Sequence, residues 1–192
     1  MVAVAVIVFQ GRISNDSSGA PHMSRQFGCG LYVSGKYADA RKYLRNALRI
    51  SRQIADVSLE STWLAWMAQL FIQMGAYRQA KLRAQLALRV ATQSRKRIQE
   101  GPALGALGVA YRYLGRYQEA LECHKRAAEI HHDLGNLLGE AAELGNLGLA
   151  HFYGGDATSA VVAYERSLKI AEVTGICPRA SLVSDRQTNW EI

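Results

Sequence analysis

Apolar and small residues recur along the chain at the spacing of amphipathic helices. Between Leu104 and Tyr111 they fall at offsets of 0, 3, 4 and 7, and the same spacing recurs between Tyr117 and Ile130. Positions spaced in this way share one face of a helix with a period of about 3.6 residues. Gly115 lies between the two runs, where a residue that accepts a positive φ can end a helix. The pattern predicts two helices joined by a tight turn.

The same pair of runs returns every 40 residues, in four copies. Each copy keeps the glycine between the runs, an alanine inside the second run and an aliphatic residue near its end. These columns are Gly35, Gly75, Gly115 and Gly155; Ala40, Ala80, Ala120 and Ala160; and Ile50, Val90, Ile130 and Ile170. A single pair cannot bury its apolar stripe, so neighbouring pairs must stack. We therefore expect an all-α fold, an α-solenoid of about four antiparallel helix pairs.

The period places each element. The first helix of each pair is expected near 23–34, 57–74, 98–114 and 138–154, and the second near 37–54, 77–94, 117–134 and 157–174. The repeats occupy about 22–56, 57–96, 97–136 and 137–176, preceded by a leader of little order (1–21) and followed by an irregular tail (177–192). The last helix carries several valines, and no helical pattern follows to cover it. Three alternatives stay open: the tail folds over this end, the chain is a fragment of a longer array, which we favour, or two chains associate end to end.

One column inside the first helix of each pair holds only small residues. Glycine within a helix costs roughly 1 kcal/mol relative to alanine, so its recurrence needs a physical reason. The column consists of Gly28, Ala68, Gly108 and Gly148. We expect the first helix to approach the second closely at this position.

The composition is that of a globular protein, with 49% hydrophobic and 20% charged residues. It excludes disordered and collagen-like chains. The 3 cysteines show no CxxC spacing, so they favour neither a disulfide framework nor a zinc site, and a reducing, cytoplasmic location is expected. The apolar run 1–9 is shorter than the roughly 20 residues of a membrane span, and no later stretch is long and apolar enough for one.

Two motifs resemble chemical sites but fit other roles better. Gly30-x4-Gly35-Lys36 matches most of a P-loop, yet Tyr37 stands where a magnesium-binding Ser or Thr is required. His131-His132-Asp133, with Cys123-His124 upstream, suggests a metal site but lacks a Cys pair or an HExxH motif. His124 also occupies the column that Tyr164 fills one repeat later, which favours a packing role. With no nucleophile motif present, we expect no enzymatic activity, cofactor or metal.

Charge is distributed unevenly along the chain, which has a net charge of +7. Residues 1–99 hold 15 Lys and Arg against 4 Asp and Glu, whereas 100–176 hold 6 against 10. Several of the basic residues follow one face of a second helix and its equivalent one repeat later: Arg41, Arg45, Arg49, Arg52, Arg78, Lys81 and Arg89. A solvated face is the simplest interpretation of such a stripe. The alternative is a patch for acidic protein, nucleic acid or anionic lipid, although aromatic residues for base stacking are not interleaved with it.

The columns resemble the tetratricopeptide repeat, whose signature is W-x2-L-G-x2-Y followed by A-x3-F and P. The third repeat carries Leu104, Leu107-Gly108, Tyr111 and Ala120, and the fourth carries Leu144, Leu147-Gly148, His151 and Ala160. The resemblance covers residues 22–176. A period of 40 and the missing closing proline are similar to repeats of Pins/LGN-type G-protein signalling modulators, rapsyn and bacterial regulatory arrays. The resemblance implies a right-handed superhelix that binds a protein or peptide.

In that family the first helices line a concave groove, and the residues between the packing columns point into it. Carried over to this chain, the groove positions are Arg25, Gln26, Cys29 and Tyr32; Trp66, Gln69, Ile72 and Gln73; Gly105, Ala106, Val109, Arg112 and Tyr113; and Gly145, Asn146, Leu149, Phe152 and Tyr153. Three functions stay open at this point. They are a non-enzymatic adaptor that binds a peptide in the groove, electrostatic binding of nucleic acid or anionic lipid through the basic half, and a structural segment of a larger regulator.

Overall fold

The computed structural model describes residues 37–175, which form seven helices and no strand. Each helix is 17 residues long. The helices are α3 (Tyr37–Gln53), α4 (Val57–Gln73), α5 (Tyr77–Gln93), α6 (Arg97–Tyr113), α7 (Tyr117–Asp133), α8 (Leu137–Tyr153) and α9 (Ala157–Val173). These bounds confirm the seven predicted helices that fall in this range. The helix expected near 23–34, the P-loop-like motif, the leader and the tail lie outside the described residues.

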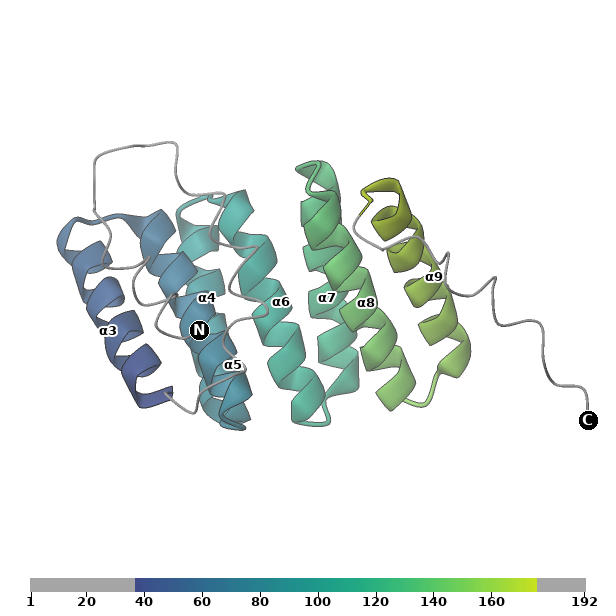
Figure 1. Cartoon of the computed structure of the whole chain (residues 1–192). Coiled ribbons are helices and arrows are strands. Elements are labelled where there is room, and N and C mark those ends of the chain that lie inside the picture. Colours follow the sequence, from purple (N-terminus) through teal and green to yellow (C-terminus); the bar gives the residue numbers. More distant parts are fainter. Residues whose placement is uncertain (1–36, 176–192) are drawn as a thin grey trace, which may run out of the picture. The chain divides into compact units, whose positions relative to one another are not determined.

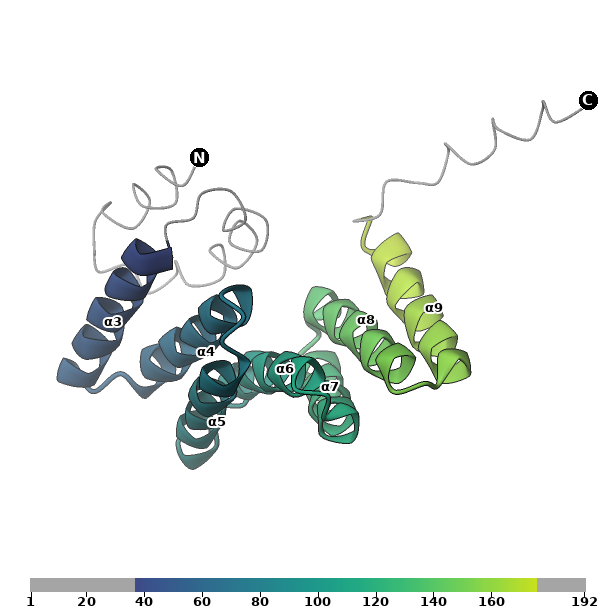
Figure 2. The ribbon, with the colours of Figure 1, turned by 90° about the horizontal axis from the view of Figure 1, so that it is seen from below.

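Backbone contacts divide the chain into two units, residues 1–40 and 41–192. Of the first unit only Tyr37–Ala40 is described. We call α4, α6 and α8 the A helices and α3, α5, α7 and α9 the B helices. Successive helices from α4 to α9 are antiparallel neighbours (Figure 1). The A helices also contact one another, α4 with α6 and α6 with α8, so within this unit they form a continuous layer (Figure 2).

Every turn uses a residue in the left-handed region. Gly75, Gly115 and Gly155 have φ values of +72°, +74° and +89° and end the A helices, as the sequence predicted. At each turn the amide that follows reaches back across the last turn of the helix; for example, the amide of Arg116 donates to the carbonyl of Tyr111 at 2.9 Å. This hydrogen bond closes a Schellman motif and satisfies a carbonyl at the helix end. The turns between repeats use the same conformation at Ala55, Arg95 and Gly135.

Small residues set the contact between A and B helices. A Cβ atom placed on Gly108 would lie 2.6 Å from Nε2 of His124, and one on Gly148 would lie 2.7 Å from Cε1 of Tyr164. These distances confirm the close approach predicted for this column. The B helices complete the contact with alanines, because Ala80, Ala120 and others along their inner faces are buried.

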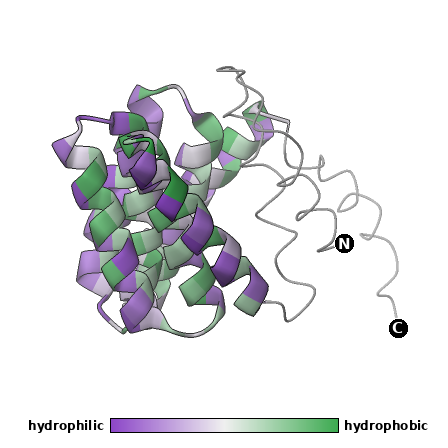
Figure 3. Ribbon diagram, turned by 90° about the vertical axis from the view of Figure 1, so that its left-hand side faces the viewer, coloured by the Kyte–Doolittle hydropathy of each residue, from purple (hydrophilic) through white to green (hydrophobic). Residues whose placement is uncertain are grey.

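The helices are amphipathic, and Figure 3 shows apolar and polar residues alternating along their ribbons. Larger apolar side chains fill the spaces between helix pairs. Leu64, Met67 and Phe71 of α4 belong to one buried cluster, and Leu104 and Leu107 of α6 belong to the next. No helix among residues 37–175 is long and apolar enough to cross a membrane. In α9 some apolar side chains stay exposed, namely Val161, Val162, Leu168 and Val173. End-to-end association, one of the three alternatives for this end of the repeats, would use this face and stays a prediction.

Candidate functional site

The groove positions of the A helices fall into an accessible part and a buried part. Trp66, Gln69, Gln73, Val109, Arg112, Asn146 and Leu149 are half-buried, whereas Tyr113, Phe152 and Tyr153 are exposed. Ile72, Gly105 and Ala106 are buried, so their assignment to the accessible strip was wrong. Gly105 faces the neighbouring A helix, because a Cβ atom placed on it would clash with Oε1 of Glu143 on α8, a contact that the periodicity of one helix does not reveal. Arg25, Gln26, Cys29 and Tyr32 lie outside the described residues.

Aromatic residues and one arginine gather where the A helices end. The ring of Tyr113, at the end of α6, stacks on Tyr77, at the start of α5, with centroids 4.5 Å apart and planes 1° from parallel. At the end of α8, Phe152 and Tyr153 meet edge to face at 5.6 Å. Arg112 lies between these groups, with its guanidinium carbon 4.5 Å from the Tyr113 ring centroid and 5.6 Å from that of Tyr153. We call these five residues the tyrosine–arginine cluster.

The cluster combines exposed apolar area with an incompletely paired cation. Tyr113, Tyr153 and Phe152 are 48%, 54% and 59% exposed. The Nε atom of Arg112 is buried and makes no hydrogen bond to the described residues. Guanidinium stacking on aromatic faces holds the Arg112 side chain in place by cation–π attraction. Its remaining N–H groups are suited to carboxylate or carbonyl oxygens, which accept the fork geometry of arginine.

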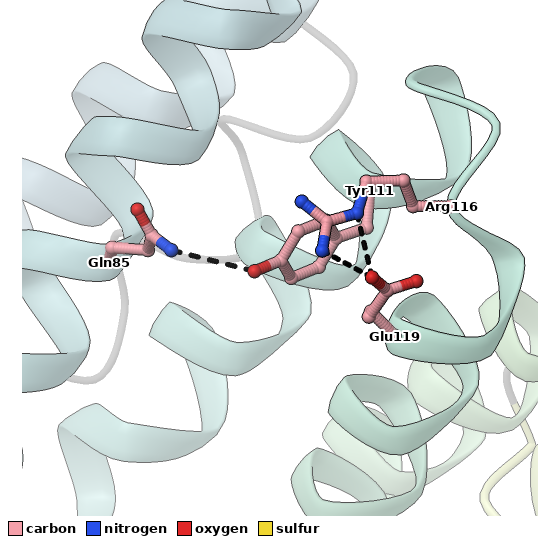
Figure 4. Close-up of polar contacts among 4 residues, drawn as sticks. All are labelled: Gln85, Tyr111, Arg116 and Glu119. Atoms are coloured by element: carbon pink, nitrogen blue, oxygen red, sulfur yellow. Dashed lines mark hydrogen bonds and ion pairs between the residues drawn. The ribbon is translucent and has the colours of Figure 1, made fainter.

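Tyr111, one residue before the cluster, joins three helices. Its hydroxyl accepts a long hydrogen bond of 3.5 Å from Nε2 of Gln85 on α5 (Figure 4). The guanidinium carbon of Arg116 lies 4.8 Å from the centroid of the Tyr111 ring. Nε of Arg116 also donates to Glu119 at 2.7 Å, which lowers the pKa of the Glu119 carboxyl below its usual value. These contacts fix the end of α6 against α5 and α7, and therefore fix the backbone that carries Arg112 and Tyr113.

The histidines that suggested a metal site instead form buried polar contacts between α7 and α8. His124 is completely buried, and its Nδ1 lies 2.7 Å from Oε2 of Glu143. His131 is 7% exposed, and Nδ2 of Asn136 lies 3.0 Å from its Nδ1.

Burial raises the pKa of the Cys123 thiol to about 11, so the thiol stays protonated at neutral pH. Within residues 37–175 no group of three or more His, Cys, Asp or Glu side chains could hold a metal ion.

The basic residues singled out in the sequence form two groups, one that lines a pocket and one that does not. Arg41, Arg45, Arg49 and Arg52 of α3 line one pocket of about 540 Å³, together with apolar residues of α3 and α4. Arg83 of α5 completes the lining, although the stripe drawn from the sequence omitted it. Arg78, Lys81 and Arg89, also on α5, are not among the residues that line this pocket. A signal for Arg83 did exist in the sequence, because it belongs to the acid-free segment between Glu60 and Glu100.

Comparisons with known proteins address the fold. The family model of the tetratricopeptide repeat matches residues 100–172. Among solved structures, BtubC (BKLC) from P. vanneervenii is similar with a TM-score of 0.66 and 21% identity, over 72% of this chain and 57% of that one. The tetratricopeptide-repeat domain of Arabidopsis FLU is similar with a TM-score of 0.57 and 20% identity, over 61% of this chain and 98% of that domain.

None of the curated proteins matches the sequence. The chain spans little more than half the length of BtubC, so the likeness concerns the arrangement of helices. The matched segment covers α6 to α9, except for the start of α6 and the last residue of α9. The same 17-residue helices and left-handed turns are also present in α4 and α5. Residues 100–172 thus match the tetratricopeptide repeat, and the described helices share the fold of an α-solenoid built from such repeats.

Proposed function

We propose that this chain is a non-enzymatic adaptor that binds an extended or helical segment of a partner protein on the face of its A helices. Tetratricopeptide repeats are in general protein-interaction modules. The observation that carries the proposal is the tyrosine–arginine cluster, in which the exposed rings of Tyr113 and Tyr153 flank Arg112 and Phe152 packs edge to face on Tyr153. Cys123 is buried and unpaired, which suits a protein of the reducing cytoplasm.

The composition of the cluster supports binding over mere surface exposure. Tyr and Arg are among the residues that most often dominate the energy of protein interfaces, and large exposed apolar groups seldom gather without a function. Tyrosine also offers a large contact area at a low cost in side-chain entropy. Because Tyr113 and Tyr153 are held by ring contacts and Arg112 lies between them, little further ordering is needed when a partner binds.

The half-buried groove positions of the A helices outside the cluster supply the polar contacts that an extended segment requires. Gln69 and Gln73 of α4 and Asn146 of α8 are half-buried along the A helices. Their amides can donate to and accept from the backbone of a bound peptide. Leu149 of α8 and Val109 of α6, also half-buried, offer apolar contacts on the same set of helices. The partner expected from this surface has an apolar or aromatic anchor residue next to a carboxylate or free carbonyl that meets Arg112.

A peptide-display selection with random sequences as ligands tests the proposal. The immobilised full chain selects peptides, and fluorescence anisotropy gives the dissociation constant of each selected sequence. Replacement of Arg112 and Tyr153 together by alanine should weaken binding by about tenfold or more, since truncating one interface anchor commonly costs about 2 kcal/mol. Circular dichroism should show unchanged helicity, because neither side chain lies in a buried apolar cluster.

A matched variant separates the cluster from the rest of the surface. Leu82→Ala with Arg89→Ala also removes one exposed apolar residue and one arginine, but from α5 and outside the strip. This control should bind selected peptides within about twofold of the original chain. Equal weakening by the two pairs, or no enrichment of any peptide, would contradict binding on the A-helix face.

A further inference from the structure

We infer that the pocket between α3, α4 and α5 is a second binding site, and that it takes an acidic amphipathic helix of a partner protein. The pocket has a volume of about 540 Å³. Five arginines surround it, and we call it the arginine pocket; its lining residues of that type are Arg41, Arg45, Arg49, Arg52 and Arg83. It is built on α3, α4 and α5, and it shares no residue with the tyrosine–arginine cluster.

The charge of the pocket is largely uncompensated. None of its lining residues is an Asp or Glu. At the rim, Nε of Arg52 lies 2.7 Å from Oε1 of Glu60, which neutralises one of the five. Arg49 donates to the neutral amide of Gln53 at 3.2 Å, and the guanidinium carbon of Arg41 lies 5.9 Å from the ring centroid of Phe71. Several positive charges therefore face a common space, a distribution that selects an acidic partner.

The floor of the pocket is apolar, which argues for a protein ligand. Leu48, Met67 and Phe71 line it and are 7%, 3% and 4% exposed. Apolar anchor side chains of a partner helix would contact these residues while its acidic residues meet the arginines. Nucleic acid would instead use exposed aromatic rings for base stacking, and Phe71, the aromatic residue in the lining, is buried.

The spacing of the arginines indicates a helix. Arg41, Arg45 and Arg49 are separated by four residues on α3. At a rise of 1.5 Å per residue they follow the helix axis at intervals of about 6 Å. Glu or Asp residues at i, i+4 and i+8 on a second helix have the same interval. A partner helix packed along α3 can therefore pair three carboxylates with three guanidinium groups in one register.

A designed peptide tests this site on the full chain. The probe is a helix of about 20 residues with a leucine seam and Glu at every fourth position beside it, long enough to be helical when bound. Its control has the same composition with the Glu spacing scrambled. We expect the probe to bind the full chain, measured by isothermal titration calorimetry, and the scrambled peptide to bind about tenfold more weakly. Equal binding of the two peptides would overturn the inference.

Charge-matched variants locate the binding. Arg45→Glu with Arg49→Glu should weaken probe binding by at least tenfold, an effect of about 1.4 kcal/mol. Arg78→Glu with Arg89→Glu makes the same change in net charge on exposed residues outside the pocket. It should change the logarithm of the probe's dissociation constant by less than a third as much. If either pair loses helicity, the single changes Arg83→Glu and Arg78→Glu, both on α5, make the same comparison. Equal effects inside and outside would show general attraction and overturn the site.

Two further measurements distinguish other occupants and the first proposed site. Single-stranded oligo(dT) and vesicles of phosphatidylcholine with phosphatidylserine are titrated under the same conditions. If either binds more tightly than the peptide and loses binding with Arg45→Glu and Arg49→Glu, the ligand is a nucleic acid or a membrane and the inference fails. Arg112→Ala with Tyr153→Ala should leave probe binding unchanged, so failure of either site is visible without the other.

Discussion

Gly108 shows how a single residue position serves the fold. The Nε2 atom of His124 lies 2.6 Å from the place where a Cβ of residue 108 would stand, and Nδ1 of the same ring lies 2.7 Å from Oε2 of Glu143 on the next helix. The sequence allowed the close approach to be predicted, because small residues recur at this column. It did not allow the buried contact of His124 with Glu143 to be predicted, since that contact joins two repeats and depends on their stacking.

Two glycine-to-alanine substitutions should have opposite effects on stability. Gly108→Ala places its Cβ 2.6 Å from His124, so it should destabilise the chain by roughly 1–3 kcal/mol through overpacking. Gly145→Ala meets only Ser167 Oγ, at 3.7 Å, and should stabilise by up to about 1 kcal/mol through helix propensity. Urea unfolding followed by circular dichroism measures both. Stabilisation by Gly108→Ala would mean that His124 moves aside at little cost.

His131 should make stability depend on pH. Desolvation by burial lowers its pKa, and Nδ1 lies within hydrogen-bond distance of the side-chain amide of Asn136, whose oxygen accepts from Gly139. The unfolded chain therefore binds more protons just below pH of about 6.5. In that window the free energy of unfolding should fall as pH is lowered. His131→Ala should flatten this slope even though it lowers stability overall; an unchanged slope would assign the effect to other groups.

At the scale of elements, the 40-residue period allowed the helix boundaries to be predicted, because each boundary recurs in every repeat. The seven described helices end within about one residue of their expected limits, since glycine marks each A–B turn. The turns between repeats were less evident. Ala55 and Arg95 take φ values of +54° and +55°, and no glycine signals these turns in the sequence.

Glycine should relieve strain at those two turns. A residue with a Cβ in the left-handed region costs roughly 1–2 kcal/mol, partly offset by the greater freedom of glycine in the unfolded chain. Ala55→Gly and Arg95→Gly should therefore each stabilise by about 0.5–1 kcal/mol, while Gly115→Ala should destabilise by about 1–2 kcal/mol. Melting temperatures of the three variants, compared with the original chain, measure this. Destabilisation by both glycine substitutions would contradict strain at these turns.

At the scale of the whole chain, sites depend on how helices stand next to one another. Arg41, Arg45 and Arg49 could be grouped from their spacing on one helix, but Arg83 joins them only because α5 packs beside α4. Likewise, Tyr77 meets Tyr113 from 36 positions away in the sequence. Periodicity within a helix therefore predicted which faces matter, and the residues supplied by neighbouring helices required the structure. The resemblance to Pins/LGN-type repeats and rapsyn stays a prediction.

The uneven charge should make stability depend on salt. The described B helix α3 and the segment from Arg78 to Arg97 are strongly basic. In these two regions the described ion pairs are those of Arg52 with Glu60 and of Arg97 with Asp133. Repulsion among the remaining cations is screened as the Debye length falls from about 30 Å at 0.01 M to about 8 Å at 0.15 M salt. The melting temperature should therefore rise over this range. Arg78→Glu with Arg89→Glu should reduce the rise, because it removes two like charges from the same region. A melting temperature that falls with salt would show that attraction between the basic and acidic halves outweighs repulsion within the basic one.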